Sequence, residues 1–98
     1  MTASPPYIDH LVWDEWNRAH ITKHRVTTNE VEEVTTGFPV FIESYKNRFV
    51  MIGPTYAGRM LSVVIGEVPS EPNVYYVFSA RSSTSREKRA YDRKQTEA

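Results

Sequence analysis

The chain has 98 residues, with 12 basic and 12 acidic side chains and no cysteine. This length supports one domain with one hydrophobic core, which we expect to span residues 1–98. The absence of cysteine excludes a disulfide framework, a thiolate metal site and a cysteine nucleophile. No basic segment followed by an apolar run opens the chain, and every apolar stretch is far shorter than a membrane span. We therefore expect a cytoplasmic protein that does not contact a membrane.

The first part of the chain predicts one short strand and one helix. Residues 1–6, which are rich in proline and small side chains, are expected to be frayed. Segment 8–13 alternates in part and predicts an edge strand. Asp14 can then cap a helix that ends at about Lys23 or His24, where a basic side chain suits the helix dipole.

A second helix is predicted after a short turn. Thr27 and Glu30 have the spacing of a capping box, in which a hydroxyl and a carboxylate each accept a backbone N–H of the first turn. Gly37 is expected to end this helix in the left-handed conformation, and Pro39 prevents its continuation.

Four runs rich in β-branched and aromatic residues follow, separated by turn residues: 40–44, 48–53, 60–66 and 74–79. Their connections are too short for helical crossovers, so these strands should form a four-stranded antiparallel meander. Thr84 and Glu87 repeat the capping-box spacing and open a last helix that ends at about Arg93. The order strand, two helices, four strands, helix predicts an α+β fold with helices packed beside an antiparallel sheet.

The end of the chain is basic although the whole chain is neutral. Between residues 81 and 94, six basic side chains stand against two acidic ones. Such a segment is either a solvated helix with surface arginines or a surface that binds a polyanion. Charge alone favours the solvated helix.

Several short motifs occur in an order that resembles a known family. They are Trp13-Asp14, Asn17, Lys23-His24, Val31-Glu32-Glu33, the strand from Arg48 to Gly53, Gly58-Arg59-Met60-Leu61, and Ser79-Ala80-Arg81 followed by Glu87, Arg89 and Tyr91. With these motifs the chain resembles, from Trp13 to Tyr91, the BrnT family of bacterial type II toxins. The resemblance implies a RelE-like fold and ribonuclease activity that needs neither a metal ion nor a cofactor. It also implies a BrnA-type antitoxin partner with a ribbon-helix-helix part, through which alone the complex would contact DNA.

RNA cleavage without a metal ion requires a base, an acid and cations. The base takes the proton of the 2′-hydroxyl, the acid protonates the leaving 5′-oxygen, and the cations neutralise the phosphoryl oxygens. Arg59 and Arg81 are the candidate phosphate ligands, because a guanidinium engages phosphate through two hydrogen bonds. An equally strong alternative for Arg81 is a salt bridge to an acidic partner such as Glu87.

His24, Lys23 and Glu87 complete the candidate catalytic residues. Histidine side chains exchange protons near neutral pH, but a histidine at a helix end is first expected to interact with the helix dipole. Lys23 could contact phosphate or be solvated, and Glu87 could act as a base, although its capping-box position explains it fully. The candidate RNA-binding residues are Arg48, Arg86, Arg89 and Tyr91.

Other residues are expected to have structural roles. Packing of Tyr91 on the core is favoured over stacking on a base. His20 and His24 share one helix face without a third ligand, and His10 lies on a separate strand, so a zinc site is not favoured. The aromatic residues expected in the core are Trp13, Trp16, Phe38 and Phe78.

Two departures from the family pattern motivate another function. Arg25 stands where the family usually has glycine, and a left-handed turn there would cost about 1 kcal/mol that glycine avoids. The last strand carries the aromatic run 75–78, where the family often has an arginine. The alternative is a catalytically inactive module that binds an antitoxin-like protein or RNA, and a purely structural domain is the third hypothesis.

Overall fold

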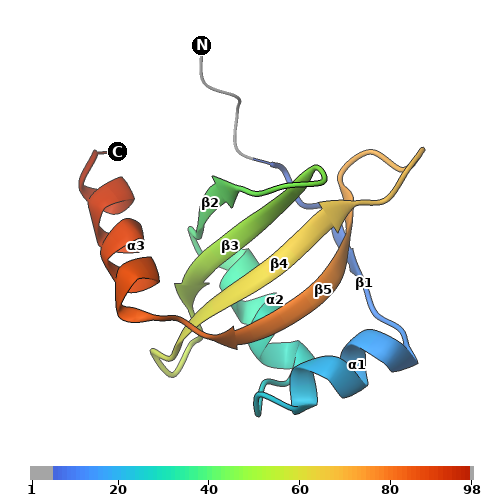
Figure 1. Ribbon diagram of the computed structural model, residues 1–98, viewed down its shortest axis with the longest axis horizontal. Coiled ribbons are helices and arrows are strands. Elements are labelled where there is room, and N and C mark those ends of the chain that lie inside the picture. The colour runs from blue at the N-terminus through green and yellow to red at the C-terminus, as the bar shows by residue number, and fades with distance from the viewer. Residues whose placement is uncertain (1–5, 98) are drawn as a thin grey trace.

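The computed structural model describes residues 6–97. The segment 1–6, which is expected to be frayed, therefore lies outside the described residues except for Pro6. The elements are β1 (His10–Val12), α1 (Glu15–Thr22), α2 (Thr28–Thr36), β2 (Val40–Glu43), β3 (Arg48–Pro54), β4 (Met60–Glu67), β5 (Val74–Ser82) and α3 (Ser85–Glu97). The strands form one sheet in the order β1-β5-β4-β3-β2 (Figure 1). β2 to β5 form the predicted antiparallel meander, and β1 pairs with β5 in parallel at the sheet edge. The α+β class is therefore confirmed.

Side-chain caps fix where α1 and α2 begin. The Asp14 carboxylate accepts a hydrogen bond from the backbone N–H of Asn17 at 2.9 Å, and the Asn17 side chain accepts one from the Asp14 N–H at 2.9 Å. Thr27 and Glu30 form the predicted reciprocal pair at the start of α2. These bonds satisfy N–H groups that have no partner inside a helix. α1 ends at Thr22, slightly earlier than the sequence predicts.

The two turns that flank α2 differ in backbone conformation. Arg25 has φ 57°, so the chain keeps a left-handed turn here without glycine and carries its cost of about 1 kcal/mol. The left-handed conformation expected at Gly37 is wrong, since its φ is −80°. The chain instead runs directly into β2, where Pro39 packs so closely on Gly53 that a Cβ on this glycine would lie 3.3 Å from it.

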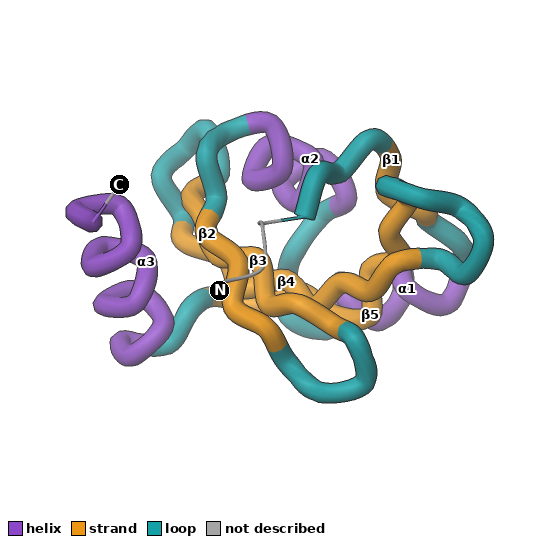
Figure 2. The backbone as a smooth tube through the Cα atoms, turned by 90° about the horizontal axis from the view of Figure 1, so that it is seen from above, coloured by secondary structure: helices purple, strands orange, loops and turns teal. Residues whose placement is uncertain are grey.

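α1 and α2 cover one face of the sheet (Figures 1 and 2). The main core between them is built by Leu11, Ile21, Val26, Val31, Val34, Met51, Leu61, Val63, Ile65, Tyr75, Val77 and Ala80. Successive residues of a strand point to opposite faces, so the intervening side chains lie on the other face. We call this other face the open face; its residues include Arg48, Ser62, Val64, Gly66, Tyr76, Phe78 and Arg81.

β5 extends to Ser82, beyond the end predicted at residue 79. The pairing with β4 shifts register at Val64 and Ile65 and then continues to Leu61, which lies opposite Ser82. Arg81 therefore lies within the strand and does not leave it. The bulge keeps Val77 and Ala80, which are three residues apart, on the same helix-covered face.

α3 lies beside β2 and β3, away from α1 and α2 (Figure 2). It runs past the predicted end at Arg93, yet among its described side chains Ala90 is the buried one. Gln95 ties it to the α2–β2 turn by donating to the carbonyl oxygen of Phe38 at 3.0 Å. α3 is therefore the most lightly packed helix of the fold.

Two aromatic residues expected in the core lie at the surface. Trp16 is 57% exposed and Phe38 is 87% exposed. Trp16 stacks on His20 with ring centroids 4.8 Å apart, because both lie on the outer side of α1. Trp13 packs against the core as expected, and Phe78 is half-buried on the open face. Within residues 6–97 no helix has the length and apolar character needed to cross a membrane.

Candidate functional site

Arg59 lies where β4 begins and holds the α1–α2 turn against the end of β5. Nη1 donates to the carbonyl oxygen of Arg25 at 2.7 Å, and Nη2 donates to that of His24 at 3.1 Å. Nε and Nη2 both donate to Ser82 Oγ, at 3.2 and 3.0 Å. A longer ion pair of 3.5 Å joins Nη1 to Glu30. Every nitrogen of this guanidinium thus donates to a protein oxygen, and a phosphate would have to displace one of these partners.

His24 and Lys23 project from the C-terminal end of α1, and both are exposed. Lys23 caps the helix, with its N–H donating to the carbonyl oxygen of His20 at 3.3 Å. The His24 ring meets the His20 ring edge-on at a centroid distance of 6.4 Å. Because Arg59 holds the His24 carbonyl, this histidine sits on a fixed turn while its ring remains open to solvent.

Arg81 and Glu87 form a two-pronged ion pair between β5 and α3. Nη1 and Nη2 of Arg81 donate to the two carboxylate oxygens of Glu87, at 2.6 and 2.8 Å. The predicted capping box is also present, because Glu87 Oε1 accepts the N–H of Thr84 at 2.8 Å and Thr84 Oγ1 accepts that of Glu87 at 3.2 Å.

The environment of Glu87 makes its carboxylate a weak base. The hydrogen bond from Arg81, followed by those from the Thr84 N–H and the Ser62 hydroxyl, lowers the pKa of Glu87 from 4.5 to about 2, although partial burial opposes this shift. At neutral pH the group is therefore ionised and has little affinity for a proton. The low proton affinity of Glu87 suits a residue that positions Arg81, and it does not suit a residue that accepts a proton from a substrate.

The candidate catalytic residues gather at one end of the sheet, but in two groups on opposite faces. Arg81 and Ser82 are neighbours on β5, so their side chains diverge. Ser82 Oγ meets Arg59 on the helix-covered side, with His24 beside it. Arg81 lies opposite Ser62 on the open face and reaches Glu87 of α3.

The candidate RNA-binding residues are divided in the same way. Arg86 and Arg89 are exposed on α3 and Tyr91 is half-buried there, on the same helix as Glu87. Arg48 lies apart from them, because it begins β3 opposite Gly66, at the far end of β4 from Arg59.

Arg48 belongs to a cluster on the open face that was not predicted from the sequence. Its guanidinium carbon lies 3.7 Å from the ring centroid of Phe78. Phe78 meets Tyr76 edge-on at 5.0 Å, and the Tyr76 hydroxyl donates to the two carboxylate oxygens of Asp14 at 3.1 and 2.9 Å. Partial burial, together with this bond, raises the pKa of Tyr76. The available signal was the alternation of two aromatic residues along one strand.

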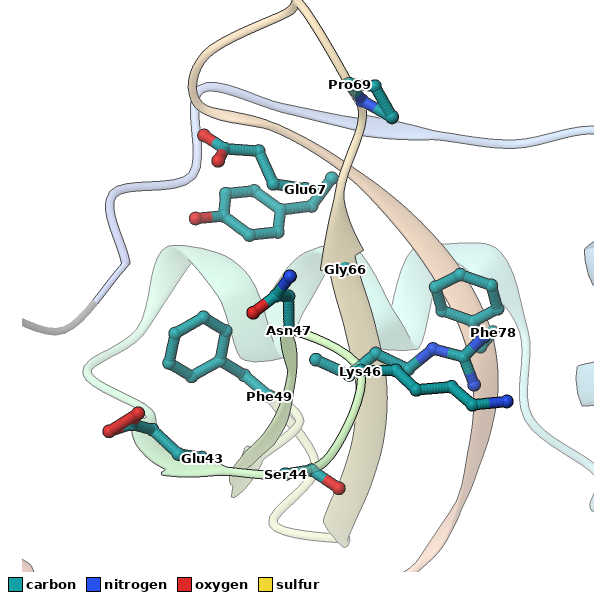
Figure 3. Close-up of a pocket in the computed structure, with 11 residues that line it drawn as sticks. Glu43, Ser44, Lys46, Asn47, Phe49, Gly66, Glu67, Pro69 and Phe78 are labelled. Atoms are coloured by element: carbon teal, nitrogen blue, oxygen red, sulfur yellow. The ribbon is translucent and has the colours of Figure 1, made fainter.

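A surface hollow of about 680 Å³ opens beside this cluster (Figure 3). The labelled side chains show that the β2–β3 hairpin contributes Lys46 and Asn47, while Gly66 and Phe78 come from neighbouring strands. The hollow thus lies at the end of the sheet that the candidate catalytic residues do not occupy.

Metal-ligating side chains do not gather in the part of the chain that the structure describes. No three histidine, aspartate or glutamate residues there lie close enough to hold an ion. His10 on β1, His20 on α1 and His24 just after α1 therefore form no common site among these residues.

The fold is similar to that of a solved protein. The crystal structure of the Brucella abortus ribonuclease toxin BrnT matches 78% of this chain and 97% of its own, with a TM-score of 0.60 and 24% sequence identity. The chain has the BrnT fold. This confirms the fold implied by the motifs between Trp13 and Tyr91. No protein-family profile matches the sequence, and a search of curated proteins found no match.

Proposed function

We propose that this chain is the toxin of a type II toxin-antitoxin pair and an endoribonuclease that acts in the cytoplasm without a metal ion. The observation that carries the proposal is the likeness of its fold to that of a ribonuclease toxin. The gathering of His24, Arg59 and Arg81 at one end of the sheet supports it. RNA cleavage requires a group that exchanges protons, and it also requires cations near the phosphate.

In the proposed reaction the 2′-oxygen of RNA attacks the adjacent phosphorus, and the bond from phosphorus to the 5′-oxygen breaks. The exposed ring of His24 takes the proton of the 2′-hydroxyl, and water protonates the departing 5′-oxygen. The products are a 2′,3′-cyclic phosphate and a 5′-hydroxyl. Lys23, beside His24, neutralises the phosphoryl oxygens at the cleaved bond. Arg81 on the open face, together with the exposed Arg86 and Arg89 of α3, holds neighbouring phosphates of the RNA backbone where the strand passes the end of the sheet.

Arg59 and Glu87 position these groups. Arg59 fixes the backbone of the turn that carries His24 through bonds of 2.7 and 3.1 Å. Glu87 orients the guanidinium of Arg81 through both of its terminal nitrogens. A phosphate at Arg81 would share this guanidinium with Glu87.

The proposed partner is a BrnA-type antitoxin with a ribbon-helix-helix part, which would also be the only contact of the complex with DNA. The light packing and basic surface of α3 support a protein partner at this helix. A short neighbouring gene for such a protein, whose product co-purifies with this chain and blocks RNA cleavage, is the expected finding.

The test of the proposal is cleavage of single-stranded RNA by the purified chain in the presence of a chelator. His24→Ala and Arg81→Ala should each slow cleavage by about 100-fold or more, with unchanged circular dichroism. Arg18→Ala, which removes an exposed arginine elsewhere on α1, is the matched control and should cleave at the normal rate. Full activity of the folded His24 and Arg81 variants would overturn the assignment of the site, and inactivity of the wild type would overturn the function.

A catalytically inactive binding module is the second candidate. The observation that favours it is that the guanidinium groups of Arg59 and Arg81 are both engaged with protein oxygens. Such a module would bind RNA or an antitoxin-like protein, cleave nothing under the same conditions and leave bacterial growth unaffected on expression.

A further inference from the structure

Arg48 differs from Arg59 and Arg81 in how its side chain is held. Arg59 donates to protein oxygens from every nitrogen, and Arg81 is paired with Glu87. Among residues 6–97, the Arg48 guanidinium forms no ion pair and donates no hydrogen bond to a protein oxygen. It is half-buried, and its central carbon lies 3.7 Å from the ring centroid of Phe78. Its N–H groups are therefore available to a ligand.

Gly66 provides the space for this stack. A Cβ at Gly66 would lie 2.9 Å from Cε2 of Phe78 and 3.4 Å from Cγ of Arg48. A larger residue would push the ring or the arginine out of place. The stack is thus formed before any ligand arrives, which lowers the entropic cost of binding to it.

We propose that Arg48 and Phe78, with Tyr76 beside them, form a site on the open face for one unpaired base of single-stranded RNA. The base stacks on the outer side of the Arg48 guanidinium, whose inner side lies on Phe78. The unpaired N–H groups of Arg48 donate to the base edge or to the adjoining phosphate. This inference rests on the proposed function and states where the substrate lies outside the cleavage site.

The carboxylates that line the same hollow lie on the opposite face of the sheet. Glu43 is paired with Phe49 and Glu67 with Tyr75, and both aromatic partners belong to the helix-covered side. The strands therefore present Arg48 on the open face without an acidic neighbour of their own. The Asp14 carboxylate, which borders the cluster, is bound by the Tyr76 hydroxyl. This charge arrangement fits a polyanion.

The site is continuous with Arg81. Phe78 and Arg81 are three residues apart on β5, and both face the open side because the bulge lies between them and interrupts the alternation. Three residues correspond to about 10 Å along a strand. A single strand that places a phosphate at Arg81 can therefore extend along β5 and lay a nearby base on Arg48. Double-stranded RNA would not fit this arrangement, because its bases are already stacked and paired.

The test uses short single-stranded RNAs whose 2′-oxygens are methylated, so that they cannot be cleaved. In each RNA one base is replaced by the fluorescent base 2-aminopurine, and a set of RNAs carries it at each position in turn. Stacking quenches the fluorescence of this base, so one titration reports both affinity and stacking. Arg48→Lys keeps the charge but loses the flat guanidinium, and Phe78→Leu keeps the apolar bulk but loses the ring. Arg18→Ala, an exposed arginine of α1 on the helix layer, is the control.

Arg48→Lys and Phe78→Leu are expected to weaken binding by about 5- to 100-fold and to remove the quenching at one position of the RNA. The salt dependence of binding should be unchanged in Arg48→Lys, because the charge is kept. The Arg18→Ala control should retain the quenching with less than about a twofold change in affinity. Circular dichroism identifies a misfolded variant, and Arg48→Lys decides the matter if Phe78→Leu does not fold.

Two results would overturn the proposal, and they have different meanings. If both folded variants bind and quench as the wild type does, the stacking site is wrong while the proposed ribonuclease function stands. If the wild type binds none of the RNAs, the stacking site and the proposed function both fail.

Discussion

Replacing Glu87 by glutamine removes the carboxylate that joins Arg81 to the start of α3. The pKa of Glu87 falls from 4.5 to about 2 on folding, which corresponds to at most about 3 kcal/mol of stability. The Arg81 side chain is 41% exposed, so water and salt reduce this contribution to about 1–2 kcal/mol. Because the pKa is lower in the folded state, the contribution is complete above about pH 4.5 and is lost as the pH falls toward 2.

Thermal unfolding followed by circular dichroism, from neutral pH down to about pH 2, measures this effect. For a domain of this size we expect Glu87→Gln to lower Tm by about 4–12 °C at neutral pH and by much less near pH 2. Glu71→Gln, which makes the same chemical change in an exposed loop, should leave Tm nearly unchanged. An equal loss at both pH values, or a loss no larger than that of the control, would refute the reasoning.

Two further substitutions test contacts that hold the candidate site. Arg59→Lys cannot reproduce the bonds to the α1–α2 turn and should reduce the free energy of unfolding by about 1–3 kcal/mol in urea titrations. The control Arg18→Lys should not change it. Equal stability of the two variants would contradict the conclusion that Arg59 stabilises this turn. Asn17→Ala leaves the carbonyl oxygens of Val12 and Val77 without donors that now lie at 2.9 and 3.0 Å, so we expect a loss of about 2–3 kcal/mol and faster amide exchange in α1. Asn29→Ala, which changes an exposed asparagine, is the control and should change the free energy of unfolding little. If Asn17→Ala lowers it no more than this control does, the buried amide does not stabilise the fold.

Local features of the fold could be predicted from the sequence because their causes lie a few residues apart. The capping boxes at Thr27 and Thr84 follow from a three-residue spacing, and both form as predicted. The antiparallel meander follows from short connections that allow no other pairing. Two turns are the exceptions: Arg25 adopts the left-handed conformation without being glycine, and Gly37 does not adopt it.

The separation of Arg59 from Arg81 could not be predicted, because it depends on register. Both residues lie at the same end of β4 and β5, and no local pattern indicates that they lie on different faces. The bulge opposite Val64 extends β5 to Ser82 and turns Arg81 to the open face. Arg59 is in turn held by carbonyl oxygens of a turn 34 and 35 residues away in the chain.

The exposure of Trp16 and Phe38 shows a related limit of sequence patterns. Aromatic residues are expected in a core because they bury a large apolar surface. Trp16 instead packs along its own helix on His20, and Phe38 lies in the turn that Gln95 of α3 approaches. Whether an aromatic side chain on a helix surface or in a turn is buried depends on long-range packing that the local sequence does not encode.

Cleavage of a DNA strand that contains a single ribonucleotide tests the central claim most directly. The proposed reaction uses one 2′-hydroxyl, so the purified chain in the presence of a chelator should cut only after the ribonucleotide. Mass spectrometry should then find a 2′,3′-cyclic phosphate on one product and a 5′-hydroxyl on the other. The account of this chain as a metal-independent ribonuclease is contradicted if neither this strand nor an all-RNA strand is cut. It is also contradicted if cutting continues when the ribonucleotide is replaced by a deoxyribonucleotide.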